Sequence, residues 1–429
     1  MVIERERYLN KLIKKKENGL IKIITGIRRC GKSYLLFELY RKYLLESGVD
    51  ENHIISLTLD DDENIKYRNP FELGKYIRGE IKDEKTYYVF IDEIQKVVNV
   101  QNPYIENAED KVGFVDVLLG LMKIKNVDLY VTGSNSKMLS SDILTEFRGR
   151  GDEIRINPLS YAEFYSATED KRHAWRDYYT YGGMPLVLSK DTHEEKSKYL
   201  KDLFANTYFA DVLERHKIND PTALDDLLNI VASSIGSLTN ATKLSKTFKS
   251  VKNVNISPKT IDGYLNDFID AFLLYKSFKY DIKGKKYIET PLKYYFSDVG
   301  LRNAWLNFRQ LEENHIMENV IYNELRVREF DVDIGVVEYN YKENGASKRK
   351  QLEVDFVANK GSKRYYIQSA LTVADESKRA QETNSLKRIA DSFKKIIVVK
   401  DDIVPWHDEN GVLYIGIEEF LLDENAMDF

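Results

Sequence analysis

A glycine-rich stretch near the N-terminus, IITGIRRCGKSYLL at residues 23–36, constrains the fold more than any other part of the chain. It matches the pattern G-x-x-x-x-G-K-[ST], between a strand-like run and a helix-like run, which is the context of a phosphate-binding loop. Its glycines let backbone N–H groups close around phosphate oxygens, and the helix N-terminus adds partial positive charge. The predicted nucleotide-binding residues are Gly26, Ile27, Arg28, Arg29, Cys30, Gly31, Lys32, Ser33 and Tyr34.

Within this loop two side chains have distinct expected roles. We expect Lys32 to reach the β- and γ-phosphates of ATP and the Ser33 hydroxyl to ligate Mg²⁺. Cys30 is the one cysteine of the chain, and we interpret it as a neutral filler of the loop.

The composition excludes several classes of protein. The chain has 429 residues, 43% of them hydrophobic and 31% charged, which is enough for roughly two to four domains. A charged N-terminus and the absence of a long apolar run argue against a secretory signal and against a membrane helix. One cysteine and six histidines exclude a disulfide framework and disfavour zinc sites. We therefore expect a cytoplasmic protein without a membrane partner.

Strand-like and helix-like runs alternate after the loop, as in a parallel sheet covered on both faces. The run YYVFIDEIQ places Asp92 and Glu93 at the C-terminal end of a strand, where ligands of open α/β sheets bind. We expect Asp92 to order Mg²⁺ together with Ser33, and Glu93 to polarise the attacking water. The other strand-like runs lie at residues 53–60, 127–134 and 152–158.

Two further groups of polar residues follow in this region. Ser134 or Asn135, at the tip of a strand, could hydrogen-bond the γ-phosphate and the water, and the sequence does not distinguish them. Arg148 and Arg150 lie on a glycine-broken loop, where an arginine can project toward the γ-phosphate of a neighbouring subunit. The alternative is a surface arginine that pairs with a nearby carboxylate such as that of Asp152.

Five motifs together resemble one family: GIRRCGKS, FIDEIQ, VTGSNS, RGRGDEIRINPLSYAEF and YGGMP. Over nearly its whole length the chain resembles the prokaryotic AAA+ ATPases with an uncharacterised, nuclease-like C-terminal region. The resemblance implies the same nucleotide and magnesium residues as above, and it implies that Arg150 is a trans-acting arginine finger. It also implies that a helical lid closes on the nucleotide at Gly182, Gly183 and Pro185.

The middle of the chain has the pattern of a winged helix-turn-helix. Helix-like runs at 227–236, 238–249 and 257–275 precede two aromatic strand runs about a Lys/Gly turn, which is the pattern of a wing. Ser257 is a good N-cap for the third helix, and Pro258 suits its first position.

The charge of this middle region differs from that of the whole chain. Between residues 241 and 293 there are eleven lysines, five acidic residues and no arginine, although the whole chain has a net charge of −5. Because lysine is a point charge that suits phosphate, we expect DNA backbone contacts with little sequence preference. The alternative is a winged helix that packs or docks a protein. The predicted DNA contacts are Lys259, Lys283, Lys285 and Lys286.

The C-terminal region resembles the restriction-endonuclease-like core, which uses two carboxylates for Mg²⁺ and a lysine in an acid-x-lysine motif. Glu318 and Asp355 match the two acidic positions. The third position departs from the pattern, because Gln368 and Ala370 stand where the acid and the lysine belong. We expect Glu318, Asp355 and Gln368 to form a degenerate site in which no lysine replaces the missing cation, so that cleavage is slow or absent.

The sequence thus predicts an α/β protein with a P-loop AAA+ ATPase core at 1–160, a helical lid at 161–220, a winged helix-turn-helix at 221–300 and a nuclease-like α/β domain at 301–429. The expected function is Mg²⁺-dependent ATP hydrolysis by a ring or other oligomer that binds and remodels DNA. Two alternatives are an ATP-regulated nuclease and a nucleotide switch whose winged helix docks DNA or a protein without motor activity.

Overall fold

The computed structural model describes residues 3–105, 109–133, 147, 149–209, 212–213, 220–343 and 346–429. The chain forms two compact units. The first comprises Met1–Asn157 with Asp270–Phe272, and the second comprises Pro158–Ile269 with Leu273–Phe429. No helix in the described ranges is long and apolar enough to cross a membrane.

The first unit is built on a five-stranded sheet in the order β2-β3-β6-β1-β7, and every neighbouring pair of strands is parallel. The predicted α/β class and the parallel sheet are therefore confirmed. A small antiparallel pair, β4 and β5, lies outside this sheet. The strands are β1 (Ile21–Thr25), β2 (Ile54–Thr58), β3 (Tyr87–Asp92), β4 (Val100–Gln101), β5 (Lys111–Val112), β6 (Val127–Gly133) and β7 (Gly151–Arg155).

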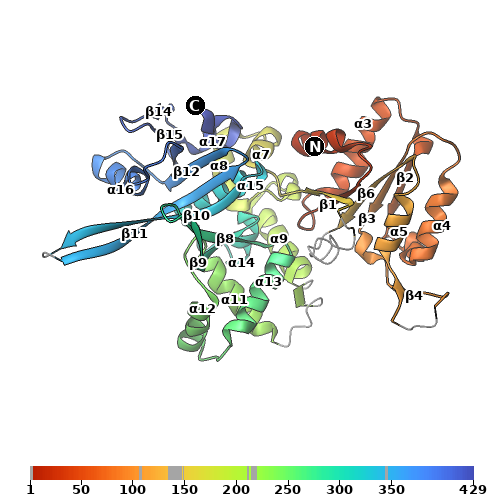
Figure 1. Cartoon of the computed structure of the whole chain (residues 1–429), viewed down its shortest axis with the longest axis horizontal. Coiled ribbons are helices and arrows are strands. Elements are labelled where there is room, and N and C mark those ends of the chain that lie inside the picture. Colours follow the sequence, from red (N-terminus) through yellow and green to blue (C-terminus); the bar gives the residue numbers. More distant parts are fainter. Residues whose placement is uncertain are drawn as a thin grey trace. The chain divides into compact units, whose positions relative to one another are not determined.

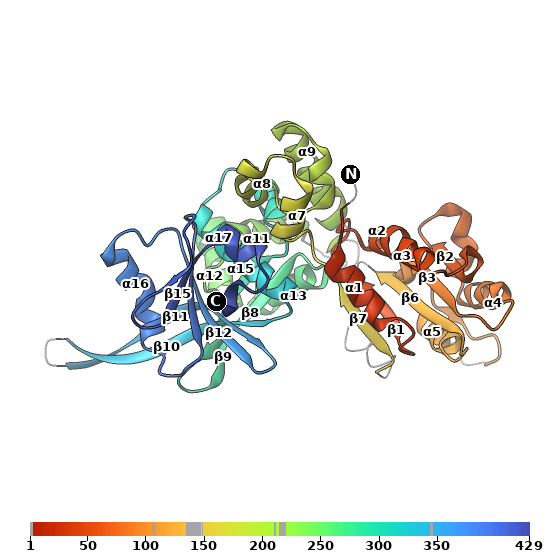
Figure 2. The same cartoon turned by 90° about the horizontal axis from the view of Figure 1, so that it is seen from above.

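Helices cover both faces of this sheet (Figures 1 and 2). On one face Ile23, Val89 and Leu129 are buried in a core shared with α4 and α5. The segment after the glycine-rich loop is a continuous helix with a π-helical turn in its middle. The helical elements are α1 (Glu6–Lys15), α2 (Lys32–Tyr34), η1 (Leu35–Tyr40), α3 (Arg41–Glu46), η2 (Glu51–His53), η3 (Asp62–Arg68), α4 (Pro70–Glu80), η4 (Ile94–Lys96) and α5 (Phe114–Leu121).

The other face of the sheet carries a buried polar network. Lys22 of β1 forms an ion pair with Asp128 of β6, and both side chains are buried. Burial lowers the pKa of Lys22, and the Asp128 carboxylate opposes that effect. Tyr130 donates to Asp128 at 2.7 Å, and its hydroxyl lies 2.6 Å from that of Tyr40. The network therefore joins two central strands to the helix that follows the glycine-rich loop.

The second unit contains an eight-stranded mixed sheet in the order β14-β15-β13-β12-β11-β10-β8-β9. The predicted wing hairpin, β8–β9, is one edge of this sheet, because β8 pairs in parallel with β10. Most side chains of β8 are buried, so neighbouring elements cover this strand. The strands are β8 (Leu274–Asp281), β9 (Lys286–Phe296), β10 (Asp331–Glu343), β11 (Ala346–Lys360), β12 (Lys363–Ala370), β13 (Lys394–Val399), β14 (Trp406–His407) and β15 (Val412–Gly416).

Three helices precede that hairpin in the order that the sequence predicts. The backbone of Thr239, between the first two of them, forms an antiparallel bridge with Leu292 of β9. Ser257 Oγ accepts from the N–H of Thr260 at 3.1 Å, which confirms the predicted N-cap. The helices of the second unit are α7 (Tyr161–Ala167), η6 (Lys171–His173), α8 (Ala174–Tyr181), η7 (Pro185–Ser189), α9 (His193–Leu203), η8 (Phe204–Phe209), α11 (Pro221–Ser233), α12 (Ala241–Thr247), η9 (Phe248–Lys252), α13 (Pro258–Asp270), α14 (Val299–Trp305), α15 (Glu313–Val327), α16 (Glu376–Lys387), α17 (Ile417–Leu422) and η10 (Ala426–Asp428).

Candidate functional site

The loop between β1 and α2 has a backbone that requires glycine at both of its ends. Gly26 has φ +141°, and a Cβ there would lie 2.1 Å from the carbonyl oxygen of Ile156. Gly31 has φ +99° and is the N-cap of α2. A side chain at either position would be strained, and at Gly26 it would also collide with backbone. The loop therefore has the close-packed backbone that a phosphate-binding cradle needs.

Lys32 and Ser33 follow directly at the start of the helix. Lys32 is buried, and its Nζ donates to the carbonyl oxygens of Gly26 at 3.0 Å and Ile27 at 3.1 Å. Ser33 Oγ donates to Asp92 Oδ2 at 2.8 Å. Two of the predicted roles are thus brought together, because the hydroxyl and the carboxylate expected to hold Mg²⁺ are in direct contact.

Thr132 completes this group, and sequence reasoning did not assign it a role. The pairing of β3 with β6 brings Thr132 beside Asp92, and Thr132 Oγ1 donates to Asp92 Oδ1. The same Oγ1 accepts from the backbone N–H of Glu93 at 3.1 Å. Burial raises the pKa of Asp92, and the hydrogen bonds from Thr132 and Ser33 oppose the increase. The sequence signal for this role was a threonine near the C-terminal end of a mostly apolar strand.

Glu93 has an unusual backbone conformation. Its φ is +54°, in the left-handed region, directly after the end of β3. Non-glycine residues in this region cost free energy and cluster at functional sites. The Glu93 carboxylate accepts from the side-chain amide of Gln95. Glu93 therefore has a strained backbone directly after the C-terminal end of β3.

Arg5 is a second residue that sequence reasoning missed. Its guanidinium is buried beneath the glycine-rich loop, donating to the carbonyl oxygen of Cys30 at 2.9 Å and to that of Asn157 at 2.8 Å. Cys30 is buried as well, with its Sγ 3.6 Å from the carbonyl oxygen of Ile156. Arg5 thus joins the loop to the segment after β7, which no motif in the sequence indicates.

The remaining candidates of the first unit are only in part described. Ser134, Asn135 and Arg148 lie outside the described residues. Arg150 is exposed, and its carbonyl oxygen accepts from the N–H of Ile21 at 2.9 Å. The nearby carboxylate of Asp152 forms an ion pair with Lys15. The position of Arg150 on the surface beside β1 is therefore known, whereas its predicted role is not tested.

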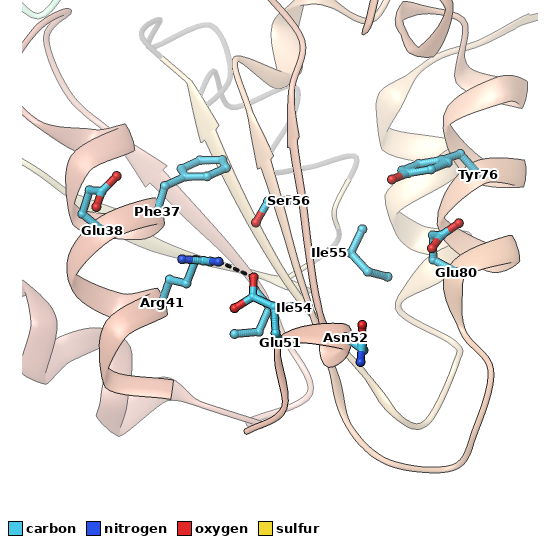
Figure 3. Close-up of a pocket in the computed structure, with 10 residues that line it drawn as sticks. All are labelled: Phe37, Glu38, Arg41, Glu51, Asn52, Ile54, Ile55, Ser56, Tyr76 and Glu80. Carbon is cyan, nitrogen blue, oxygen red and sulfur yellow. Dashed lines mark hydrogen bonds and ion pairs between the residues drawn. The ribbon is translucent and has the colours of Figure 1, made fainter. Parts of the chain in front are cut away.

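A groove of about 560 Å³ lies at the edge strand β2, in the same unit, and Figure 3 shows residues that line it. Ser56 of β2 lines it between Phe37 of η1 and Tyr76 of α4, and an ion pair joins Arg41 to Glu51. None of the predicted site residues lines this groove.

The predicted degenerate nuclease site lies in the second unit, between α15, β11 and β12. Glu318 and Asp355 are both buried. Asp355 Oδ2 accepts from the N–H of Ser369 at 2.8 Å, and Gln368 Oε1 accepts from the N–H of Asp355 at 3.4 Å. The structure therefore brings the three predicted residues to one place. The described residues contain no group of three or more His, Cys, Asp or Glu side chains arranged to hold a metal ion.

The prediction that no lysine replaces the missing cation is wrong. Lys293, which reaches the site from β9, donates to Glu318 Oε1 at 2.8 Å and forms an ion pair with Glu353 at 2.6 Å. Burial disfavours the charge of Lys293, but Glu318 and its neighbouring carboxylates outweigh burial and raise its pKa. Burial, followed by the charge of Glu318, raises the pKa of Asp355, and Lys293 opposes this.

The predicted DNA contacts fall in two places. Lys283 and Lys285 are exposed on the turn between β8 and β9, and Lys286 is exposed at the start of β9. Lys259 is exposed on the first turn of α13. Lys283 Nζ donates to the carbonyl oxygen of Glu338 at 2.9 Å. Two of the eleven lysines of this region, Lys279 and Lys293, are buried and do not contribute to a basic surface.

The YGGMP motif packs against α14 within its own unit. Gly182 has φ +71°, and a Cβ there would lie 2.3 Å from the Asp298 carboxylate. The N–H of Gly183 donates to Asp298 Oδ2 at 2.6 Å. Burial raises the pKa of Asp298 to about 6. The two glycines thus have a packing role, and closure of a lid on nucleotide at this motif stays a prediction.

Two protein families match successive parts of the chain. A family described as an AAA domain matches residues 18–165, and a family described as a domain of unknown function matches residues 172–312. An uncharacterized protein of Haemophilus influenzae is 33% identical over 407 residues, which cover 92% of this chain and 93% of that protein. An uncharacterized protein of Methanocaldococcus jannaschii is 28% identical over 423 residues, covering 94% and 85%.

Among solved structures, the Aeropyrum pernix ORC1 protein in complex with DNA is similar at 10% identity and a TM-score of 0.30. The alignment covers 72% of this chain and 93% of that chain. Cdc6p from Pyrobaculum aerophilum aligns at 11% identity over 75% of this chain and 96% of that chain, with a TM-score of 0.28. At these scores neither likeness supports a statement about function.

Proposed function

We propose that this chain couples Mg²⁺-dependent ATP hydrolysis to the binding and remodelling of DNA. The chain belongs to the same family as the Haemophilus influenzae protein, and its residues 18–165 match an AAA domain. The observation that carries the hydrolysis is the chain of hydrogen bonds from Ser33 through Asp92 to Thr132, beside the buried amine of Lys32.

The residues of the loop fit a nucleotide triphosphate and its metal. The glycines at both ends of the loop allow the tight backbone turn of a phosphate-binding cradle, and Lys32 supplies a buried cation for the phosphates. Ser33 Oγ and the Asp92 carboxylate supply hard oxygen ligands, which Mg²⁺ prefers. Bound Mg²⁺ would neutralise charge on the phosphate groups.

The chain's own residues would then orient the attacking water. Glu93 is the base that accepts the proton of the water, and its strained backbone and the hydrogen bond to Thr132 hold it at the sheet edge. Thr132 positions Glu93 and Asp92 together, because one oxygen contacts both residues. A displacement of either carboxylate would affect the other.

The proposed action on DNA rests on the second unit. The exposed lysines of the β8–β9 turn supply positive charge, and the helix order with the Thr239–Leu292 bridge supports a winged helix. Assembly into a ring or other oligomer is part of the proposal, in which Arg150, an exposed residue, acts on the nucleotide of a neighbouring subunit. A nucleotide switch without motor activity is the alternative.

The experiment is an ATPase assay on the full chain, alone and with single-stranded, duplex or branched DNA. We expect turnover that rises with DNA, that is lost with Lys32→Ala because the phosphates lose the cation of the loop, and that stops in Glu93→Gln although nucleotide still binds. Slow turnover that no DNA changes would favour the switch. Parental turnover in Glu93→Gln would show that Glu93 is not the base.

A further inference from the structure

Strands β10 and β11 continue beyond the body of the eight-stranded sheet as a two-stranded arm (Figures 1 and 2). We define this arm as residues 338–343 and 346–351. The pairing is regular, from Glu338 opposite Gln351 to Glu343 opposite Ala346. The side chains described in the arm are exposed or half-buried, in contrast to the buried residues 332–337 that precede it. The arm has no core of its own, so its surface is available to a partner.

Both faces of the arm carry basic residues. Side chains directly opposite each other on paired strands lie on the same face, and successive side chains alternate between faces. Tyr339 is opposite Lys350 and Tyr341 is opposite Lys348, so these four share one face. The other face contains Glu338, which forms an ion pair with Arg349. This other face also contains Lys342, and Glu343 has the register of the tyrosine–lysine face, so each face of the arm itself has two basic residues and one acidic residue.

A further cation extends the tyrosine–lysine face. The guanidinium of Arg388, which follows α16, lies 3.7 Å from the centre of the Tyr339 ring. Such stacking of arginine on an aromatic ring is favourable and holds the guanidinium beside the arm. Arg388 is exposed, as are Lys348 and Lys350. The face thus presents three cations and two tyrosines.

The arm is also continuous with the lysine turn of β8–β9. Lys283 Nζ contacts the carbonyl oxygen of Glu338, the first residue of the arm, and the N–H of Ile282 donates to the carbonyl oxygen of Val336 at 3.0 Å. Lys285 is exposed on the same turn, and Lys286 is exposed directly after it at the start of β9. The lysine turn therefore lies directly beside the start of the arm.

We propose that the tyrosine–lysine face of the β10–β11 arm binds duplex DNA through its phosphates, with the arm lying in or along the major groove. This inference rests on the proposed function, whose DNA-binding surface it extends. The major groove of B-DNA has the width to admit a two-stranded β-ribbon. Lysine suits phosphate as a point charge, and arginine pairs with phosphate through its planar fork. The arm thereby contributes backbone contacts that do not depend on sequence.

The test compares two double variants of the full chain in binding to a labelled duplex of mixed sequence over a range of salt. Lys348→Gln/Lys350→Gln removes two cations of the face, and Lys123→Gln/Lys125→Gln removes two exposed lysines of the first unit as a control of equal charge. We expect the arm variant to bind roughly eightfold more weakly per lost contact at 0.1 M salt, with a slope of log K against log salt flatter by about 0.9 per contact. The control should bind like the parent.

Other outcomes separate this proposal from the function on which it rests. If the arm variant binds like the parent while Lys285→Gln/Lys286→Gln binds more weakly, the arm proposal fails and DNA binding by the lysine turn stands. If the parent chain binds no duplex, both proposals fail. The major groove of duplex RNA is too narrow and deep for a β-ribbon. If the arm variant loses as much affinity for duplex RNA as for duplex DNA, the placement of the arm in the major groove is wrong. If the arm variant loses affinity only for an acidic polypeptide and not for DNA, the arm binds a protein partner instead.

Discussion

The Nζ of Lys293 lies 2.8 Å from Oε1 of Glu318, and both side chains are buried between β9 and α15. Tyr295 also donates to Glu318 Oε1, at 2.7 Å, and Glu353 lies 2.6 Å from the same ammonium. The ammonium thus occupies the centre of a carboxylate cluster. A cation that belongs to the chain itself balances the charge of this cluster.

Lys293→Met should destabilise the second unit strongly. The substitution leaves the Glu318 and Glu353 carboxylates without their cation, and breaking a buried pair in this way costs about 3–5 kcal/mol. Unfolding in denaturant measures the change. Lys285→Met, on the exposed turn, is the control and should change the free energy of unfolding by less than about 0.5 kcal/mol. The double variant Lys293→Met/Glu318→Gln should recover part of the loss, and no recovery would contradict the pairing.

The same cluster predicts the absence of cleavage. A metal ion at Glu318 and Asp355 would have to compete with the Lys293 ammonium, and the third ligand, Gln368, is neutral. We expect no nicking of branched or single-stranded DNA in Mg²⁺ or Mn²⁺, with or without ATP. Cleavage that disappears in Asp355→Ala and persists in Lys32→Ala would reverse this conclusion and favour the ATP-regulated nuclease.

Thr132→Val should reduce ATP turnover about a hundredfold while leaving nucleotide affinity nearly unchanged. Valine has the shape of threonine but lacks the oxygen that holds Asp92 and the N–H of Glu93, and small displacements of catalytic groups can cost that much in rate. Thr132→Ser, which keeps the hydroxyl, is the matched control and should retain most of the activity. Equal rates for the two variants would show that the hydroxyl has no positioning role.

Local motifs predicted much of the first unit. Short residue patterns predicted the glycine-rich loop, the five parallel strands and the contact of Ser33 with Asp92. Thr132 was missed because its role depends on the register between β3 and β6. Arg5 was missed because its partner Asn157 lies far along the chain and a buried arginine has no local pattern.

The second unit shows the same limit at longer range. The order of its three helices before the β8–β9 hairpin was predicted, and so were Glu318 and Asp355 as members of one site. A cation was expected only on β12, the strand that carries Gln368. Lys293 comes instead from β9, which is the last strand in the sheet order and is separated from β12 by β11, β10 and β8. A lysine that reaches a site from a distant strand does so through tertiary packing, so the spacing of residues in the sequence does not reveal it.

Arg150→Ala should leave ATP affinity nearly intact and reduce turnover, if the arginine acts on the nucleotide of a neighbouring subunit. The exposed position of Arg150 beside the start of β1 permits this role. Mixing Arg150→Ala with Lys32→Ala should restore some activity, because each mixed interface can combine an intact arginine with an intact loop. Full turnover by a chain that light scattering finds monomeric with ATP and DNA would rule out the prediction.

The stability of the chain should depend on pH through Asp298, whose buried carboxyl accepts from the N–H groups of Gly183 and Leu301. Burial raises its pKa from 3.8 to about 6. Between these values the folded state binds more protons than the unfolded state, so the free energy of unfolding falls as pH rises from 4 to 6. The gap corresponds to about 3 kcal/mol.

Asp298→Asn provides the measurement, because the amide does not titrate. The variant loses one of the two acceptor oxygens and should be less stable than the parent at pH 4. Its deficit should shrink by up to about 3 kcal/mol by pH 7, since only the parent acquires a buried negative charge over that range. Asp402→Asn, at an exposed carboxylate, is the control and should follow the parent at every pH. If the stability deficit of Asp298→Asn stays constant between pH 4 and 7, the pKa of the Asp298 carboxyl is not raised in the folded state. The prediction is then wrong.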